Sequence, residues 1–416
     1  MTQQVSLRAN MIWNSAGSFI SLICQWLITV LVVKLSNSFE AAGVLSICMA
    51  IANIFTPIAQ FKVRVFQVSD IKDEYSASEY TAFRILTILV ALVGSCGYAI
   101  ATESPATIPA IMLYVVYKLI DSFIDVLHGI DQKNMRMDIC GKSMAVRGVL
   151  SLLFFCVTMA TTKSLSLSIA AMCLSTVPVI PYDWKMAKQY ERLLPAISAG
   201  RAAELAKNCL PAVLGTACCT AVVSVARQIL GDISGAEALG IYASVCTPVV
   251  IVQAGAGYIY APLLGVFAGH IDRNETTRFF QLLIKVLVAM LGLALVGDMV
   301  FFIMGKPFLT IAFGAETSSY SFLMYAAIAS VMLCAAASFL TDQLIAARES
   351  KWVFLGNLIP LVIVIFVTKP LIDKLGMNGC SISISVAYAV GSVLMLIALY
   401  RAVKSRKELP CKSSRT

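Results

Sequence analysis

Residues 279–303 read FFQLLIKVLVAMLGLALVGDMVFFI, a run in which Lys285 and Asp298 are the charged residues. A helix needs about 20 mainly apolar residues to cross the hydrocarbon core of a membrane, so this stretch is long enough to span it. Comparable apolar runs recur along the whole chain. They predict spanning helices over residues 10–34, 40–61, 81–101, 107–129, 144–162, 164–182, 208–227, 238–267, 279–303, 319–347, 352–372 and 378–400. The expected fold is an all-α integral membrane protein with about twelve transmembrane helices.

The composition agrees with this prediction. Of the 416 residues, 59% are hydrophobic and 13% are charged, and the mean hydropathy is +0.84. These values exclude an ordinary soluble enzyme, a disordered chain and a secreted disulfide scaffold. Catalytic motifs are missing, and His128 and His270 have no Cys or carboxylate cluster at ligand spacing, so we expect no enzyme activity, no metal site and no cofactor.

Lys and Arg are distributed unevenly over the connections between the predicted helices. Roughly 23 of them lie on one set of alternate connections and the two ends of the chain, against roughly six on the other set. The positive-inside rule therefore predicts that both termini are cytoplasmic. The net charge of +9 is explained by this bias, and the basic tail 401–416 can contact anionic membrane lipids. The positive net charge gives no reason to expect a nucleic-acid partner.

The chain also shows signs of two halves. The longest strongly charged connection, residues 183–207, separates six predicted helices from six. The second helix of each half opens alike, with Glu-Ala-Ala-Gly at residues 40–43 and Glu-Ala-Leu-Gly at residues 237–240. Both repeats begin on the cytoplasmic side, so they are expected to be parallel. We predict two six-helix bundles around a central cavity, with an N-terminal bundle at 1–190, a C-terminal bundle at 191–400 and the tail at 401–416.

Four predicted helices each carry a polar stripe on one face. At 100° per residue, each stripe falls within an arc of about 60–80°. The stripes are Asn10, Asn14, Ser18, Ser21 and Gln25; Asn53, Gln60, Arg64 and Gln67; Tyr114, Lys118, Asp121, Asp125 and His128; and Thr216, Thr220, Ser224 and Arg227. Such residues either hydrogen-bond one helix to another or line a hydrated cavity, because polar groups are costly in hydrocarbon.

The charged stripe of the fourth helix has two interpretations. Lys118 and Asp121 are three residues apart and can neutralise each other on the helix surface. Alternatively, Lys118 faces an anionic substrate, and Asp121 or Asp125 holds its ammonium group in place or carries a coupling proton. Arg147 lies near the cytoplasmic end of its helix, so we expect its guanidinium to reach the interface as an anchor.

One loop carries a family resemblance. Residues 64–71 read Arg-Val-Phe-Gln-Val-Ser-Asp-Ile, and Tyr75-Ser76, Tyr80 and Phe83-Arg84 follow. This pattern resembles the first long cytoplasmic loop of the bacterial O-antigen and polysaccharide repeat-unit flippases, which belong to the multidrug/oligosaccharidyl-lipid/polysaccharide (MOP) exporter superfamily. Phe66 replaces the Tyr that is usual in the family. The motif covers about 20 residues, whereas the layout of two six-helix halves covers the whole chain.

The resemblance implies a function in surface-polysaccharide biosynthesis, including the O antigen of lipopolysaccharide. The protein would move an oligosaccharide on undecaprenyl pyrophosphate from the cytoplasmic to the periplasmic leaflet of the bacterial inner membrane, by alternating access. A polysaccharide polymerase and a chain-length regulator would be its partners.

The substrate implied by the resemblance suggests roles for the polar residues. Amide side chains suit a sugar, and cations suit a diphosphate. We assign Asn14, Gln25, Asn53 and Gln60 to the sugar, and Arg64, Lys118 and Arg227 to the diphosphate, with Asp121 and Asp125 beside Lys118. In the loop motif, Gln67, Asp70, Tyr80 and Arg84 would serve gating and substrate access. Alternatively, Arg64, Asp70 and Arg84 form an ion-paired clamp between the second and third helices.

Two other functions fit parts of the sequence. Drug and cation antiporters (MATE-like) of the same superfamily favour acids in the cavity, and Asp121, Asp125 and Asp342 are consistent with that function. The loop motif argues against it. A scaffold for glycan-assembly enzymes is the second alternative, but a scaffold does not need polar stripes on four helices.

Overall fold

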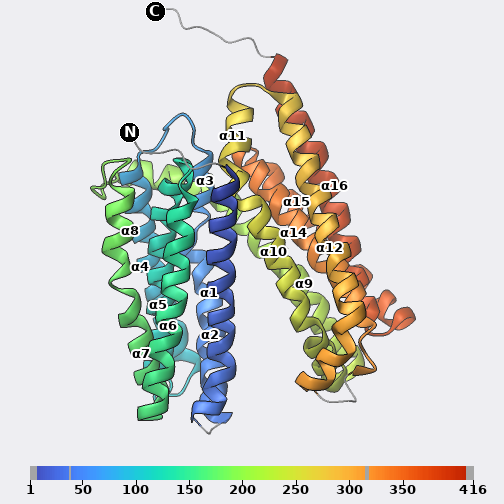
Figure 1. The fold of residues 1–416 in the computed structure, drawn as a ribbon. Coiled ribbons are helices and arrows are strands. Elements are labelled where there is room, and N and C mark those ends of the chain that lie inside the picture. Colours follow the sequence, from blue (N-terminus) through green and yellow to red (C-terminus); the bar gives the residue numbers. More distant parts are fainter. Residues whose placement is uncertain (1–6, 37–38, 314–317, 409–416) are drawn as a thin grey trace, which may run out of the picture. The chain divides into compact units, whose positions relative to one another are not determined.

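The computed structural model describes residues 7–36, 39–313 and 318–408, and within these ranges the regular structure is helical, with no strand. Figure 1 shows the helices in chain order. The N-terminal helices are α1 (Leu7–Ser36), α2 (Phe39–Gln60), α3 (Val63–Ser69), α4 (Ala77–Thr102), α5 (Ile108–Lys133), α6 (Met137–Thr162), α7 (Leu165–Thr176) and α8 (Val179–Ala187). The others are α9 (Ala199–Cys246), α10 (Val250–Tyr260), α11 (Leu264–Asp272), α12 (Thr276–Phe313), α14 (Leu323–Ala346), α15 (Ser350–Leu375) and α16 (Asn378–Glu408), with 3₁₀ turns at Thr247–Val249 and Ala261–Leu263.

The prediction of about twelve transmembrane helices is confirmed. Eleven helical segments of the described chain are long and apolar enough to cross a membrane. The twelfth is α5, whose 26 residues have the required length but carry several charged side chains. The chain is therefore a multi-pass membrane protein.

Two predicted spans are interrupted in the structure. The span predicted at 164–182 consists of α7 and α8. The span predicted at 238–267 is broken by 3₁₀ turns that contain Pro248 and Pro262, because proline lacks the N–H group that a continuous α-helix needs. Gly235 separates this span from the one before it, with φ 85° and ψ 167°, a backbone conformation that essentially only glycine adopts.

The chain divides into two compact units, Met1–Cys209 and Leu210–Thr416. The sequence predicts the boundary between the two halves at residue 190, in the connection that precedes α9. Hydrogen bonds explain why this connection belongs to the first unit. The backbone N–H of Ala77 donates to the Glu191 carboxylate at 3.2 Å, and the Ser78 hydroxyl donates to the carbonyl oxygen of Arg192 at 2.8 Å.

In the N-terminal unit α5 is the central helix, since it contacts α2, α3, α4, α6, α7 and α8. Its buried residues Ile111 and Val115 belong to an apolar core with Cys48, Phe155 and Met159. The pair α1 and α6 is packed through glycine. A Cβ atom at Gly141 would lie 2.1 Å from the carbonyl oxygen of Trp13, so the two backbones approach as closely as small residues permit.

This close approach leads to a prediction. We expect Gly141→Ala to destabilise the protein by about 1–3 kcal/mol, because the added methyl group overpacks the contact between α1 and α6. Thermal unfolding of the purified protein measures the effect. Gly97→Ala is the matched control, since a Cβ atom there meets nothing within 4 Å. Equal melting temperatures for the two variants would contradict the proposed packing.

In the C-terminal unit, α16 packs against α14 and α15, and α10 contacts both α12 and α14. Polar side chains connect these helices in the buried interior. The Asn357 amide donates to the Thr341 hydroxyl at 2.9 Å, and the Thr368 hydroxyl donates to the Ser383 hydroxyl at 3.0 Å. These pairs link α15 to α14 and to α16, as expected where helices associate without a hydrophobic driving force.

Candidate functional site

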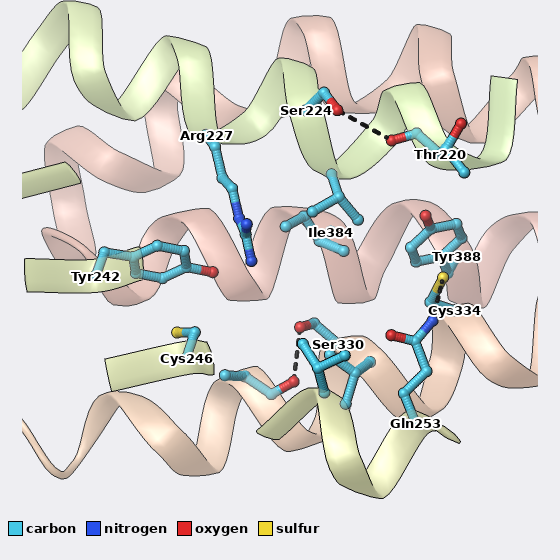
Figure 2. Close-up of a pocket in the computed structure, with 14 residues that line it drawn as sticks. Thr220, Ser224, Arg227, Tyr242, Cys246, Gln253, Ser330, Cys334, Ile384 and Tyr388 are labelled. Atoms are coloured by element: carbon cyan, nitrogen blue, oxygen red, sulfur yellow. Dashed lines mark hydrogen bonds between the residues drawn. The ribbon is translucent and has the colours of Figure 1, made fainter. Parts of the chain in front are cut away.

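A cavity of about 280 Å³ lies inside the C-terminal unit and is lined by α9, α10, α14 and α16. Figure 2 shows the residues around it. Its polar lining side chains are Thr220, Ser224, Arg227, Tyr242, Gln253, Ser330 and Tyr388. The other lining residues supply hydrocarbon and sulfur, and none of the lining residues carries a carboxylate. The site is therefore an apolar pocket with one cation and a small set of hydrogen-bonding groups.

Arg227 is the charged residue of the pocket. Its side chain extends from α9 toward the opposite wall (Figure 2). The guanidinium carbon lies 5.9 Å from the centre of the Tyr242 ring, close enough for a cation–π interaction. Its Nε atom is buried without a hydrogen-bond partner, and within the described residues Arg227 forms no ion pair. A half-buried cation of this kind can hold an anion through charge-assisted hydrogen bonds.

Internal hydrogen bonds position the other polar groups of the pocket. The Tyr388 hydroxyl donates to the carbonyl oxygen of Cys219 at 2.6 Å, and the Ser330 hydroxyl donates to that of Ala327 at 2.7 Å. The Gln253 amide nitrogen lies 3.3 Å from the Cys334 sulfur. Each donor is used, but the hydroxyl oxygens of Tyr388 and Ser330 keep lone pairs that can accept from a ligand's hydroxyl groups.

Asp125 is the centre of a charged cluster in the N-terminal unit. Its two carboxylate oxygens accept from Arg64 Nη1 and Arg84 Nη2, each at 3.0 Å. Arg64 Nε also donates to Gln132 at 3.0 Å, and Arg84 Nη1 donates to the Ala59 carbonyl oxygen at 3.0 Å. Arg84 is completely buried. One carboxylate thus joins α3, α4 and α5, which makes Asp125 the member of the clamp that the sequence motif did not include.

Asp121 forms a second cluster one turn earlier on α5. Lys118 Nζ lies 3.8 Å from one of its oxygens, and Arg147 of α6 forms an ion pair with the other. The Lys118 ammonium also lies 5.3 Å from the centre of the Tyr117 ring. Arg147 is only 11% exposed, so the expectation that it anchors at the interface is wrong. Asp121 supplies a counter-ion within the bundle, so the Arg147 guanidinium is not left there as an unpaired charge.

Asp70 organises the loop of the sequence motif. Its carboxylate accepts from the backbone N–H groups of Glu74 and Tyr75 at 3.1 and 3.0 Å, and from the Tyr80 hydroxyl at 2.9 Å. Gln67 is buried on α3, and its amide oxygen would lie 2.1 Å from a Cβ atom at Gly129. These contacts fix the loop against α4 and α5, which favours the clamp interpretation of the motif over gating.

The loop also holds the connection that leads into α9. Arg201 forms a bidentate ion pair with Glu79, with N···O distances of 2.6 and 3.1 Å. Its guanidinium carbon lies 4.4 Å from the centre of the Tyr75 ring. Burial raises the pKa of the Tyr75 hydroxyl above its ordinary value, with the nearby Glu204 charge adding to the shift. Tyr75 and Arg201 are therefore a packed pair at the base of α9.

The polar stripe of α1 faces α6. The Asn10 amide donates to the carbonyl oxygen of Met135 at 2.6 Å, and the Ser18 hydroxyl lies 3.6 Å from the Met144 sulfur. Asn14 is buried next to them, with 4% of its surface exposed. Of the two interpretations of this stripe, hydrogen bonding between helices fits these contacts.

The structure separates the predicted site residues into groups. Thr220, Ser224 and Arg227 lie together in the pocket, whereas Arg64 and Lys118 are paired with acids in the other unit. Gln25 and Gln60 are half-buried, and Asn53 is exposed. Tyr242, Gln253, Ser330 and Tyr388 line the pocket but were not predicted. They come from α9, α10, α14 and α16, and no sequence spacing relates them.

Several known proteins are similar to this chain. No family model matches it. The capsular polysaccharide biosynthesis protein CapF of Staphylococcus aureus is 20% identical over 381 residues, which cover 91% of this chain and 95% of CapF. The MATE transporter VcmN of Vibrio cholerae, in its bent form, superimposes with a TM-score of 0.77 at 14% identity, covering 98% of this chain and 99% of VcmN.

A MOP superfamily transporter from Pyrococcus furiosus has the same TM-score of 0.77 at 12% identity, and the match covers 98% of each chain. At these identities the likeness establishes the fold. Two independent solved structures agree over nearly the full length. The chain therefore has the all-helical fold of the MATE transporters of the MOP superfamily.

Proposed function

We propose that this protein is a flippase for an anionic lipid-linked oligosaccharide, which it moves across the bacterial inner membrane from the cytoplasmic to the periplasmic leaflet. The substrate is a surface-polysaccharide repeat unit on undecaprenyl pyrophosphate. The observation that carries the proposal is Arg227, a cation in an intramembrane pocket that lacks any carboxylate in its lining. Ionisable residues of this kind inside a membrane usually mark a substrate pathway.

The charge balance of the bundles supports an anionic substrate. Among the three cations assigned to the diphosphate, Arg64 is paired with Asp125 and Lys118 with Asp121. Arg227 is the one for which the described residues supply no counter-ion. The same pairs occupy Asp121 and Asp125, the acids that an organic-cation antiporter would need to leave free. The charge of the pocket in the C-terminal unit is therefore positive, which is the wrong sign for binding a cationic drug.

The lining groups also suit the remainder of the substrate. A sugar needs hydroxyl and amide partners, which Ser330, Gln253 and Tyr388 provide, and the pocket volume accommodates part of a head group while the polyprenyl tail remains in lipid. Transport would proceed by alternating access, in which the site opens first to one side of the membrane and then to the other.

The comparisons favour the same substrate class. CapF is named as a capsular polysaccharide biosynthesis protein. The Pyrococcus furiosus transporter is described as having a binding pocket of reversed polarity that suggests a different function. A pocket built around Arg227 would give this chain a positive site within the same fold. A polysaccharide polymerase and a chain-length regulator remain its proposed partners.

The proposal is tested by deleting the gene in its host. We expect loss of surface polysaccharide and accumulation of complete repeat units on undecaprenyl pyrophosphate in the cytoplasmic leaflet. Mass analysis of the trapped lipid then identifies the glycan. Normal polysaccharide together with altered sensitivity to organic cations would overturn the proposal in favour of a drug or cation antiporter.

A further inference from the structure

A buried acid in the N-terminal unit has no hydrogen-bond partner for its carboxylate among the described residues. Asp131 lies in the last turn of α5 and is completely buried. Neither of its carboxylate oxygens has a hydrogen-bond partner. A carboxylate that is buried without hydrogen bonds is strongly disfavoured, because no dipole or counter-charge replaces its water shell. The clamp at Asp125 and the Arg227 pocket do not use this residue.

A second buried acid, which faces a histidine, lies beside Asp131. Asp183 of α8 is also completely buried, and one of its oxygens accepts from the Ser143 hydroxyl at 2.7 Å. Its other oxygen lies 3.6 Å from His128 Nε2, and both of these atoms lack a hydrogen bond. The His128 ring, 2% exposed, thus faces Asp183 from one turn before Asp131 on α5.

Ionisable groups of the surrounding elements lie near Asp131. They are Arg64 of α3, Arg136 of the connection after α5, Asp138 and Cys140 of α6, and Tyr182 and Asp183 of α8. The two arginines do not neutralise Asp131 by direct contact. Arg64 pairs with Asp125, and Arg136 forms a two-pronged ion pair with Asp138 at 2.8 and 3.1 Å.

The unmet hydrogen bonds of Asp131 lead to the inference. Arg64 and Arg136 are held by Asp125 and Asp138, so neither contacts Asp131 directly, and the nearby Asp183 is a second buried carboxyl group. A proton on Asp131 removes a buried charge that no hydrogen bond stabilises within the described residues. We propose that Asp131 is a proton-binding site of the N-terminal unit, which holds its proton in this conformation and releases it when the helices around it rearrange.

The site favours a proton over a metal ion. Within the described ranges, no group of three or more His, Cys, Asp or Glu residues could hold a metal. The unpaired atoms are two carboxylate oxygens of Asp131, one of Asp183 and an imidazole nitrogen, and imidazole is a poor ligand for an alkali cation. Release of the proton leaves a carboxylate that needs water or a freed arginine beside it. Proton exchange is therefore linked to a change in the packing of α3, α5, α6 and α8.

Infrared spectroscopy tests the proposal on the full-length protein in lipid nanodiscs at neutral pH. A protonated carboxyl group has a carbonyl stretch that an ionised carboxylate lacks. We expect the spectrum of the wild-type protein minus that of Asp131→Asn to show the loss of one such component. Asp73→Asn is the control, since Asp73 is 71% exposed on the loop before α4, and it should leave the component in place.

Three results would overturn the proposal. The wild-type and Asp131→Asn spectra would show the same protonated-carboxyl component if Asp131 is ionised. The component would disappear in Asp183→Asn but persist in Asp131→Asn if the proton resides on Asp183. Replacing potassium by sodium in the buffer would abolish the protonated-carboxyl component if the site holds a metal cation. Asparagine matches the shape of the neutral acid, so the variant should fold.

A second measurement uses the unmodified protein. A hydrophobic carbodiimide reacts with protonated carboxyl groups in apolar surroundings, and mass spectrometry locates the product. We expect modification of residue 131 that decreases as the pH rises. An absence of modification at residue 131 under conditions where other buried acids react would contradict the proposal. Neither measurement depends on the substrate, so failure here is distinguishable from failure of the proposed flippase function.

Discussion

Arg227→Gln is expected to decrease export of surface polysaccharide by roughly 10- to 100-fold, the effect of losing hydrogen bonds from a charged group to the substrate. Glutamine keeps a polar side chain but is shorter than arginine and removes the positive charge. Because Arg227 forms no ion pair within the described residues, its replacement leaves no acid unpaired and the protein should remain abundant in the membrane. The measurement is complementation of a deletion host, with polysaccharide staining and immunoblotting of the membrane fraction.

Two further variants make this result specific. Arg227→Lys keeps the charge but loses the planar guanidinium that binds phosphate in a bidentate manner, so partial export is expected. Arg278→Gln is the control for loss of an arginine, since Arg278 is 68% exposed and pairs with Glu275. Export at the wild-type level by Arg227→Gln would exclude the pocket as the anion site.

Asp125→Ala is expected to destabilise the N-terminal unit by about 3–5 kcal/mol, the usual cost of breaking a buried ion pair by removing one partner. Two guanidinium groups lose their shared counter-ion, and one of them, Arg84, is completely buried. The variant should be present at low abundance in the membrane and should melt at a lower temperature than the wild type.

The control is an ion pair at the surface of the same unit. Asp73 pairs with Lys133 at 2.5 Å but is 71% exposed, so Asp73→Ala should cost about 1 kcal/mol or less. Thermal unfolding of both variants in detergent compares the two effects. Equal stability of Asp125→Ala and the wild type would show that the clamp contributes nothing to the fold.

Helix α5 shows how far the sequence predicts this structure. The length of α5 and the apolar residues between its charges were enough to predict a span. A helix needs only one apolar face to pack against its neighbours. The partners of those charges were beyond prediction. Asp121 pairs with Arg147 and Asp125 with Arg84, and both arginines are on other helices. Which acid meets which base depends on helix rotation and packing, which periodicity within one helix does not determine.

The pocket shows the same limit for function. Arg227 stood out because an arginine on the polar face of a membrane helix is costly unless it is used. Gln253 and Ser330 did not stand out, since single amide and hydroxyl side chains in membrane helices usually hydrogen-bond to neighbouring helices. Asn14 illustrates the reverse case: it lies on a polar stripe, yet the structure places it in the contact between α1 and α6.

Reconstitution of the purified protein into proteoliposomes tests the central claim most directly. Undecaprenyl-pyrophosphate-linked oligosaccharide is placed in both leaflets, and its movement is followed by the fraction of glycan accessible to an enzyme added outside. The account predicts that the wild-type protein makes the inner-leaflet glycolipid accessible, that Arg227→Gln does so far more slowly, and that neither takes up an organic cation. Uptake of an organic cation without any movement of the glycolipid would contradict it.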